Sequence, residues 1–296
     1  MMPEGDTVLQ TAARLHQLLA GDVVVRSEFR VPQLATTDLS GWLVREAIPV
    51  GKHLLIRLRA PAEVSSKGAR PTRDFTLHSH LMMDGIWRFQ EASWPRPRDF
   101  RVRAMLETAR VRAYAEDVQG FELVPTRDEA ALIGHLGPDL LNPRFSELDV
   151  EASVERILAR PARSVSSALM DQRNLAGIGN IYRNETMFLI GLRHGVRVGD
   201  VAAEKVEEAV RTAHRLLDLN KFRLPRSTTG LAARGRDSLW VYVRGGRPCR
   251  RCGERILVAE HDDSVLALGP SGEVLERDGR PLKLRWVWWC PSCQRG

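Results

Sequence analysis

The chain has 296 residues, 43% of them hydrophobic, enough for one large domain or two ordinary ones with separate cores. Lys and Arg outnumber Asp and Glu by 44 to 37 and the sequence pI is about 9.7, so a nucleic-acid partner is a live hypothesis. No apolar stretch approaches the ~20 residues of a membrane span, and the start lacks a secretion signal, so we expect a soluble, cytoplasmic protein.

The first predicted element is a helix within residues 8–21, VLQTAARLHQLLAG. Asp6 or Thr7 is expected to cap its start and Gly21 its end. Its apolar residues recur at spacings of four, three and four, which places on one helical face Val8, Ala12, Leu15 and Leu19.

From there to about residue 125, short β-rich runs such as HLLIRLRA, FRVRAMLE and ARVRAYAE are separated by Gly, Pro and charged turns. This pattern predicts an antiparallel sandwich or flattened barrel. The stretch HSHLMMDGIW, residues 78–87, is interpreted as a strand and turn.

Helical patterns dominate the second half, so the expected fold class is α+β with two domains. The sequence predicts a β domain at 1–125, a linker at 126–147, a helical domain at 148–245 and a metal module at 246–296. The segment 221–248 before the metal module is interpreted as a long mobile loop.

Two Cys-x-x-Cys pairs carry the strongest spacing signal, and they are formed by Cys249, Cys252, Cys290 and Cys293. Four thiolates in this pattern predict one closed, structural Zn²⁺ site. Residues 259–280 between the pairs are interpreted as an inserted hairpin or loop. The run LKLRWVWW would, as a strand, present Lys283 and Arg285 on one face, where they could contact phosphate or simply meet solvent.

Two further stretches carry polar residues at turns. In GIGN, Gly177 and Gly179 allow a tight turn before a helix that starts near Asn180, and such a helix start can accept phosphate, although an ordinary helix connection fits as well. In GKHLL, Lys52 stands at the head of an apolar strand, where it would usually be an ordinary edge charge.

Together these features resemble the formamidopyrimidine-DNA glycosylase and endonuclease VIII family. The matching stretches, spread in order from residue 3 to residue 294, are PEGDT, GKHLL, HLMMDG, LGPDLL, DQRNLAGIGNIYRNE and CRRCG with WCPSCQ. The chain looks more like the endonuclease VIII branch, because it has EDVQGF at 116–121 where the other branch carries an Arg-Arg-Phe motif.

The resemblance implies a β-sandwich with a leading helix, followed by a helix-two-turn-helix domain and a four-cysteine zinc finger. It implies a bifunctional DNA glycosylase and abasic-site lyase of base excision repair. Such an enzyme excises oxidised bases, here expected to be pyrimidines, through a Schiff base on an N-terminal proline and then cleaves the strand by β,δ-elimination. We expect damaged DNA as partner, a monomer, a nucleoid-associated location and no cofactor beyond structural zinc.

The resemblance also assigns roles to single residues. The amine of Pro3 would attack the sugar, Glu4 would move protons at the sugar ring, and Lys52 would be the second proton-transfer group. Asn180 would hold a backbone phosphate, and Arg285 would contact phosphate and assist δ-elimination. The predicted DNA contacts also include Lys283, the wedge residue Met83 and, at the position of a DNA-contacting arginine, His135.

Two departures and the start of the chain qualify this assignment. Met82 stands where the branch has a polar DNA contact, and His135 replaces an arginine. The sequence therefore leaves open how the space of the flipped nucleotide is filled and which opposite base is preferred. Because the nucleophile must be an N-terminal proline, we expect the functional start at Met2 with later removal, or trimming of both methionines.

Three other functions remain open from the sequence. One is a purine-lesion glycosylase like the sister branch, and another is a non-catalytic binder of damaged or single-stranded DNA. An RNA-bound translation factor with a zinc ribbon would explain the charge and the cysteines but not PEGDT.

Overall fold

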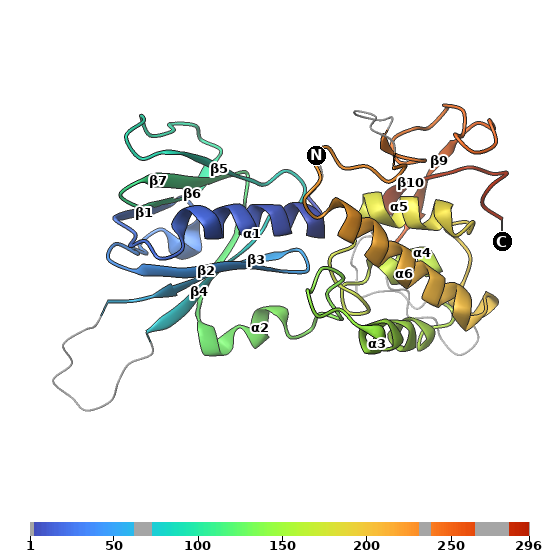
Figure 1. Ribbon diagram of the computed structural model, residues 1–296, viewed down its shortest axis with the longest axis horizontal. Coiled ribbons are helices and arrows are strands. Elements are labelled where there is room, and N and C mark those ends of the chain that lie inside the picture. The colour runs from blue at the N-terminus through green and yellow to red at the C-terminus, as the bar shows by residue number, and fades with distance from the viewer. Residues whose placement is uncertain (1–2, 62–72, 231–237, 264–283, 296) are drawn as a thin grey trace. The chain divides into compact units, whose positions relative to one another are not determined.

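The structure is a computed structural model that describes residues 3–61, 73–230, 238–263 and 284–295 (Figure 1). The chain divides into two compact units, Met1–His135 and Leu136–Gly296. The predicted boundaries of a linker, a helical domain and a metal module remain predictions. Met1, Met2, Lys283 and most of the predicted 259–280 insertion lie outside the described residues.

The first unit begins with helix α1, Gly5–Leu19, and the predicted apolar face of this helix is buried. The predicted start is wrong: the cap residue is Glu4, whose backbone is extended at φ −126° and ψ −174° and whose side chain makes no capping bond. Asp6 instead lies in the first turn, where its Oδ1 accepts the backbone N–H of Thr7 at 2.8 Å. Gly21 follows the helix end at φ +86°.

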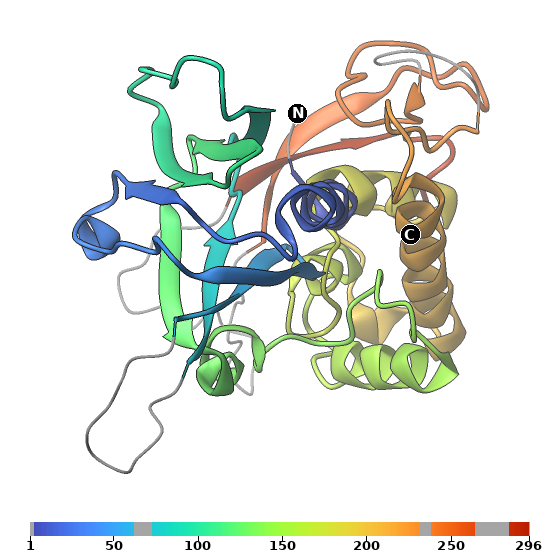
Figure 2. The ribbon, with the colours of Figure 1, turned by 60° about the vertical axis from the view of Figure 1, so that its left-hand side comes forward.

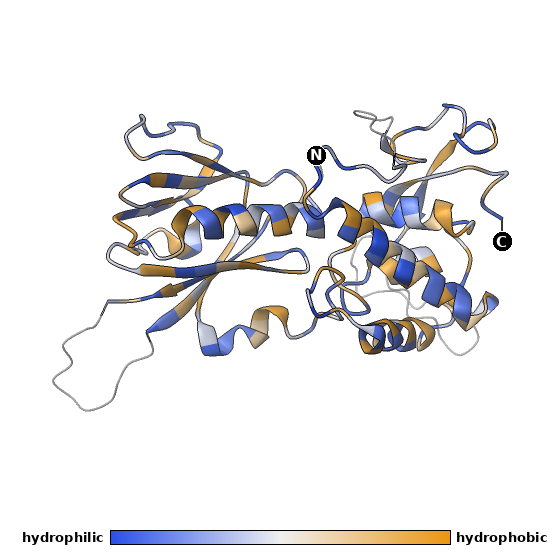
Figure 3. Ribbon diagram, in the orientation of Figure 1, coloured by the Kyte–Doolittle hydropathy of each residue, from blue (hydrophilic) through white to orange (hydrophobic). Residues whose placement is uncertain are grey.

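Two four-stranded antiparallel sheets form a sandwich around the core of this unit. One sheet has the order β2-β3-β4-β8, with bounds Leu43–Val50, His53–Arg59, Asp74–His80 and Gly120–Pro125. The other has the order β1-β6-β7-β5, with bounds Arg26–Phe29, Val102–Glu107, Val111–Glu116 and Ile86–Glu91. Hydrophobic and hydrophilic residues are interspersed along these strands (Figure 3), and the predicted β-sandwich with a leading helix is confirmed.

Strand β2 was not among the β-rich runs recognised in the sequence. Its segment LVREAIPV contains Glu46 and Pro49, and its register with β3 shifts between Val44 and Glu46. The shift interrupts the two-residue alternation by which a strand is recognised. Three short elements complete the unit: the 3-10 turns η1 and η2, at Pro32–Leu34 and Thr126–Asp128, and helix α2 at Ala130–Ile133.

The second unit is helical, with a core shared by its helices. Its elements are α3 Glu147–Leu158, α4 Val165–Met170, α5 Asn180–Leu189, the 3-10 turn η3 Val198–Asp200 and α6 Ala203–Asn220. Helix α3 begins with a capping box, in which Ser146 and Asp149 satisfy each other's backbone N–H groups. The match of residues 136–220 to the H2TH domain, with α4 and α5 joined by residues 171–179, confirms the helix-two-turn-helix domain predicted from the family resemblance.

An antiparallel hairpin of β9, Leu257–Asp262, and β10, Leu284–Trp289, ends the second unit. Strand β10 packs beside α5 (Figures 1 and 2). The side chains of Leu284 and Trp286 are about half exposed, whereas Val287 is 3% exposed. The inner face of β10 therefore includes Arg285, so this arginine does not lie on a fully solvated strand face.

Candidate functional site

The start of α1 and the turn between β2 and β3 lie at the same end of the first unit (Figure 1). The backbone after α1 bonds the start of β2, and His16 Nδ1 accepts the N–H of Ala47 at 3.3 Å, so helix and strand run antiparallel. Glu4 directly precedes α1, and Lys52 lies in the turn between β2 and β3. Glu4 and Lys52 therefore belong to segments at the same end of the first unit.

Three histidines that the sequence analysis did not select surround this turn. On the β3–β4 ladder His53 faces His80, and its Nδ1 lies 2.8 Å from Nε2 of His78. The His53 ring also meets the exposed ring of His135 edge to face, with centroids 6.1 Å apart. The available signal was the alternation in His-Ser-His, which places His78 and His80 on one strand face. Lys52 and His135, both predicted site residues, therefore belong to one cluster.

Burial makes the inner histidines poor bases. It lowers the pKa of His53 to about 3, with further contributions from the surrounding histidines and Lys52. It lowers the pKa of His80 to about 4, and the Lys52 ammonium acts in the same direction. At neutral pH these imidazoles are neutral, so they can exchange hydrogen bonds without adding charge beside Lys52.

The turn after β4 carries two exposed methionines. Met82 and Met83 are 56% and 53% exposed, and Met82 adopts a left-handed backbone at φ +53°. Its N–H donates to His80 Nδ1 at 2.9 Å. A Cβ at Gly85 would stand 2.5 Å from the carbonyl oxygen of Leu81, so the turn requires glycine there. An exposed apolar side chain on a braced turn suits the predicted wedge role of Met83.

In the second unit, Gln172 fixes the turn before α5. Its Oε1 accepts the N–H of Gly177 at 3.0 Å, and its Nε2 donates to the carbonyl oxygen of Ile178 at 3.0 Å. Gly177 has φ +101°, a region that favours glycine. Helix α5 then begins at Asn180, as the sequence analysis expected.

Two asparagines of α5 bond the backbone of β10. Asn180 Nδ2 donates to the carbonyl oxygen of Trp286 at 3.1 Å, and Asn184 Oδ1 accepts the N–H of Trp288 at 2.7 Å. Asn180 is 5% exposed. The strand that carries Arg285 is therefore fixed to the helix that carries Asn180.

A carboxylate links the same two elements. Asp263, which follows β9, pairs with Arg183 of α5, and its Oδ2 lies 3.4 Å from Nε of Arg285. Arg183 in turn donates to Oδ1 of Asn180. The structure thus joins Asn180 and Arg285 through two residues that the sequence analysis did not select. Asp263 had no usable sequence signal, because it lies 80 residues from Arg183.

The four cysteines form the metal site predicted from their spacing. Their ligand atoms all lie within 4.8 Å of one another. The Sγ atoms of Cys249 and Cys293 are 3.8 Å apart and those of Cys252 and Cys290 are 3.4 Å apart, close to the ~3.8 Å that tetrahedral bonds of ~2.3 Å require. Burial raises the pKa of the Cys290 and Cys293 thiols, a cost that a bound cation would offset. The residues fit a metal ion.

Glu185, in the middle of α5, holds the segment before the metal site. This fully buried carboxylate accepts the backbone N–H groups of Trp240, Val241 and Tyr242 at 2.7 to 2.9 Å and the hydroxyl of Thr228. The described part of the predicted mobile loop is therefore tied to α5.

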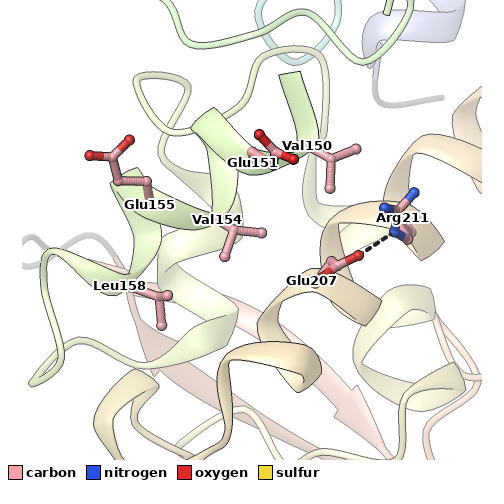
Figure 4. A pocket seen from close by; sticks show the side chains of 7 residues that line it. All are labelled: Val150, Glu151, Val154, Glu155, Leu158, Glu207 and Arg211. Atoms are coloured by element: carbon pink, nitrogen blue, oxygen red, sulfur yellow. Dashed lines mark hydrogen bonds and ion pairs between the residues drawn. The ribbon is translucent and has the colours of Figure 1, made fainter. Parts of the chain in front are cut away.

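A groove between α3 and α6 is a poor candidate for DNA (Figure 4). Three glutamates line it, Glu151, Glu155 and Glu207, together with one arginine, Arg211. Arg211 is already paired with Glu207 at 2.7 Å. This acidic lining disfavours a phosphate ligand.

Comparison with solved structures identifies the fold. A Lactococcus lactis Fpg in complex with abasic-site DNA aligns with 99% of this chain and 100% of its own, at 20% identity and a TM-score of 0.73. A complex of Lactococcus lactis Fpg with DNA containing N7-benzyl-Fapy-dG aligns equally fully, at 21% identity and a TM-score of 0.74. The fold is that of Fpg-type proteins. Among the residues that the structure describes, no helix is long and apolar enough to cross a membrane.

Sequence relatives define the family. The profile of the formamidopyrimidine-DNA glycosylase N-terminal domain matches residues 2–124, and that of the H2TH domain matches residues 136–220. "Probable endonuclease 8 2" of Streptomyces coelicolor is 40% identical over 100% of this chain and 95% of its own length. "DNA-(apurinic or apyrimidinic site) lyase Nei2" of Mycolicibacterium smegmatis is 37% identical over 99% of both chains. The chain belongs to the formamidopyrimidine-DNA glycosylase and endonuclease VIII family of DNA repair enzymes.

Proposed function

We propose that the protein is a bifunctional DNA glycosylase and abasic-site lyase that excises oxidised pyrimidines in base excision repair. The supporting observation is the placement of Glu4 and Lys52 at one end of the sandwich, in a chain that aligns end to end with a relative named as an abasic-site lyase. The protein acts as a monomer in the cytoplasm, associated with the nucleoid, and needs no small-molecule cofactor.

The reaction begins at Pro3, whose secondary amine is free once the preceding methionines are removed. The amine attacks C1′ of a flipped nucleotide, the glycosidic C1′–N bond breaks, and the base leaves with the proton that the attacking nitrogen gives up. The nitrogen lone pair then forms an iminium with C1′ as the sugar ring opens, and Glu4 supplies the proton that O4′ takes up.

The iminium withdraws electrons and acidifies the proton on C2′. Loss of this proton breaks the bond from C3′ to its phosphate oxygen, which is β-elimination. Loss of the C4′ proton then breaks the bond at C5′, which is δ-elimination, and water releases the sugar fragment from Pro3. Lys52 serves as the second proton-transfer group.

The other predicted residues hold the DNA. Asn180 and Arg285 bind backbone phosphate, and Arg285 assists the second elimination. Met83 fills the space left by the flipped nucleotide, and His135 and Lys283 add contacts to the strand. Cys249, Cys252, Cys290 and Cys293 hold one Zn²⁺ ion, which stabilises the hairpin that carries Arg285.

Borohydride trapping tests the proposal. Protein that begins at Pro3 is mixed with a duplex containing one abasic site, reduced, and mapped by mass spectrometry. We expect a covalent adduct on the Pro3 nitrogen, and none with protein that retains Met2. Absence of an adduct from the Pro3 form would favour the non-catalytic DNA binder.

Lesion preference needs a second assay. Single-turnover excision is compared on duplexes that carry thymine glycol, 5-hydroxyuracil or 8-oxoguanine. We expect faster release of the two pyrimidines, whereas faster release of 8-oxoguanine would assign the protein to the purine-lesion specificity.

A further inference from the structure

We propose that Asp263 is a positioning residue that presents Arg285 and Asn180 to DNA as one preformed phosphate-binding unit. Asp263 lies between Arg183 of α5 and Arg285 of β10. The inference rests on the proposed function, which gives the phosphate to Arg285 and Asn180.

Asp263 is a buried carboxylate whose two oxygens have different partners. Its side chain is 4% exposed. Oδ1 accepts from Arg183 and from the hydroxyl of Ser167 on α4, the latter at 3.2 Å. Oδ2 makes no hydrogen bond within the described part of the chain and faces Nε of Arg285 at 3.4 Å. Oδ1 thus anchors the carboxylate to α4 and α5, and Oδ2 faces Arg285.

The charges of Arg183, Asp263 and Arg285 stabilise one another. Arg183 has 0% side-chain exposure, and a guanidinium removed from water is stable only with a close anion. Arg285 is 38% exposed, so its guanidinium reaches solvent while Asp263 faces its Nε edge. Among the described residues, none accepts a hydrogen bond from the two terminal nitrogens of Arg285. These nitrogens are the pair that binds phosphate in bidentate fashion.

Arg183 extends the effect of Asp263 to Asn180. Oδ1 of Asn180 accepts from both Arg183 and Asn184, which fixes the orientation of the amide. Its Nδ2 group must then face the opposite way, toward β10. One carboxylate therefore orients both predicted phosphate ligands before DNA arrives, which lowers the entropy cost of binding.

The test is a double-mutant cycle in the full-length, metal-loaded protein. Binding to a duplex with a tetrahydrofuran abasic analogue is measured by fluorescence anisotropy for wild type, Asp263→Asn, Arg285→Gln and the double variant. We expect Asp263→Asn to weaken binding roughly three- to tenfold, the range for immobilising one or two side chains. In the Arg285→Gln background the same change should cost much less, because Asp263 acts partly through Arg285.

Glu260→Gln is the matched control. It removes one negative charge from the exposed face of β9, opposite Trp286, and should leave binding unchanged. A general effect of charge would instead strengthen binding in both variants. The ratio of δ- to β-elimination products gives a second readout, which should fall in Asp263→Asn and stay at the wild-type value in Glu260→Gln.

A measurement on the wild type keeps the inference testable if Asp263→Asn does not fold. The Nε–Hε signal of Arg285, assigned by its loss in Arg285→Gln, should show a heteronuclear NOE close to backbone values. A freely mobile Nε–Hε, tighter DNA binding by Asp263→Asn, or an equal loss in both backgrounds would overturn the inference. Wild-type protein that neither binds nor cleaves the duplex would refute the proposed function itself.

Discussion

Nδ1 of His53 on β3 lies 2.8 Å from Nε2 of His78 on β4, so one buried imidazole donates a hydrogen bond to the other. Such a pair accommodates at most one added proton at low cost, because the second proton would leave two donors facing each other. A carboxylate lies beside the pair, with Oε1 of Glu122 on β8 3.6 Å from His78 Nδ1. The histidine cluster therefore has consequences for stability in acid.

The first prediction concerns pH. In the unfolded chain a histidine titrates near pH 6.5, whereas the folded pKa values of His53 and His80 are about 3 and about 4. Below about pH 6.5 the two histidines bind protons in the unfolded state but not in the folded state, so the free energy of unfolding falls as the pH decreases toward 4. Thermal unfolding followed from pH 8 to pH 5 should show the first unit losing stability.

A pair of variants checks the cause of this slope. His53→Gln should flatten the dependence of the melting temperature on pH. Val44→Ala, a buried apolar change in the same unit, should lower the melting temperature by a similar amount at every pH. Equal slopes in wild type and His53→Gln would show that the cluster is not responsible.

The second prediction separates the two reactions. Glu4→Gln should reduce base excision by roughly 10² to 10⁴ through loss of a proton-transfer group, while some cleavage of a preformed abasic site remains. Asp6→Asn, a neighbouring buried carboxylate at the start of α1, is the control and should retain excision. Single-turnover assays on lesion and abasic duplexes measure both steps, and equal loss of both in Glu4→Gln would contradict the proton-transfer role.

The third prediction tests the exposed turn. Met83→Ala should slow excision from duplex DNA by roughly tenfold or more, because filling the vacated stack offsets part of the few kcal/mol that unstacking costs. The same variant should act normally on single-stranded substrate, which needs no wedge. Met82→Ala serves as the control for loss of an exposed methionine, and a similar defect on both substrates would argue against the wedge.

The fourth prediction concerns the cysteine site. Cys293→Ser should reduce the zinc content below one per chain and weaken DNA binding, because structural zinc in finger peptides contributes ~10–16 kcal/mol of apparent binding energy. Ser292→Ala, in the same turn, should retain the metal. Elemental analysis and anisotropy check both variants, and full binding by metal-free protein would show that the site does not support the DNA interface.

The features that could be predicted from the sequence are those whose pattern lies within a short stretch of the chain. The helical face of Val8 and Leu15 and the spacing of Cys249 and Cys252 each lie within one element or turn. The start of α1 was predicted too late because Glu4 precedes the helix without a side-chain capping bond. Local propensity gives little weight to a start of that kind.

The rest depends on contacts between residues distant in the chain. His53 and His78 meet only because β3 and β4 pair in one register, and Asp263 meets Arg183 only after the pair of strands β9 and β10 packs beside α5 through β10. In the family resemblance, Arg285 was assigned by its distance from Cys290, but nothing nearby indicated the carboxylate beside it. Sequence motifs do not identify positioning residues of this kind.

The bonds from Asn180 and Asn184 to the backbone of β10 have an evolutionary consequence. These two helix side chains hold the strand that carries Arg285 directly, through the backbone of Trp286 and Trp288. Lengthening that connection costs little free energy, because loop-closure entropy grows only slowly with length. Relatives in this family can therefore gain or lose residues between the two strands while the arginine keeps its place.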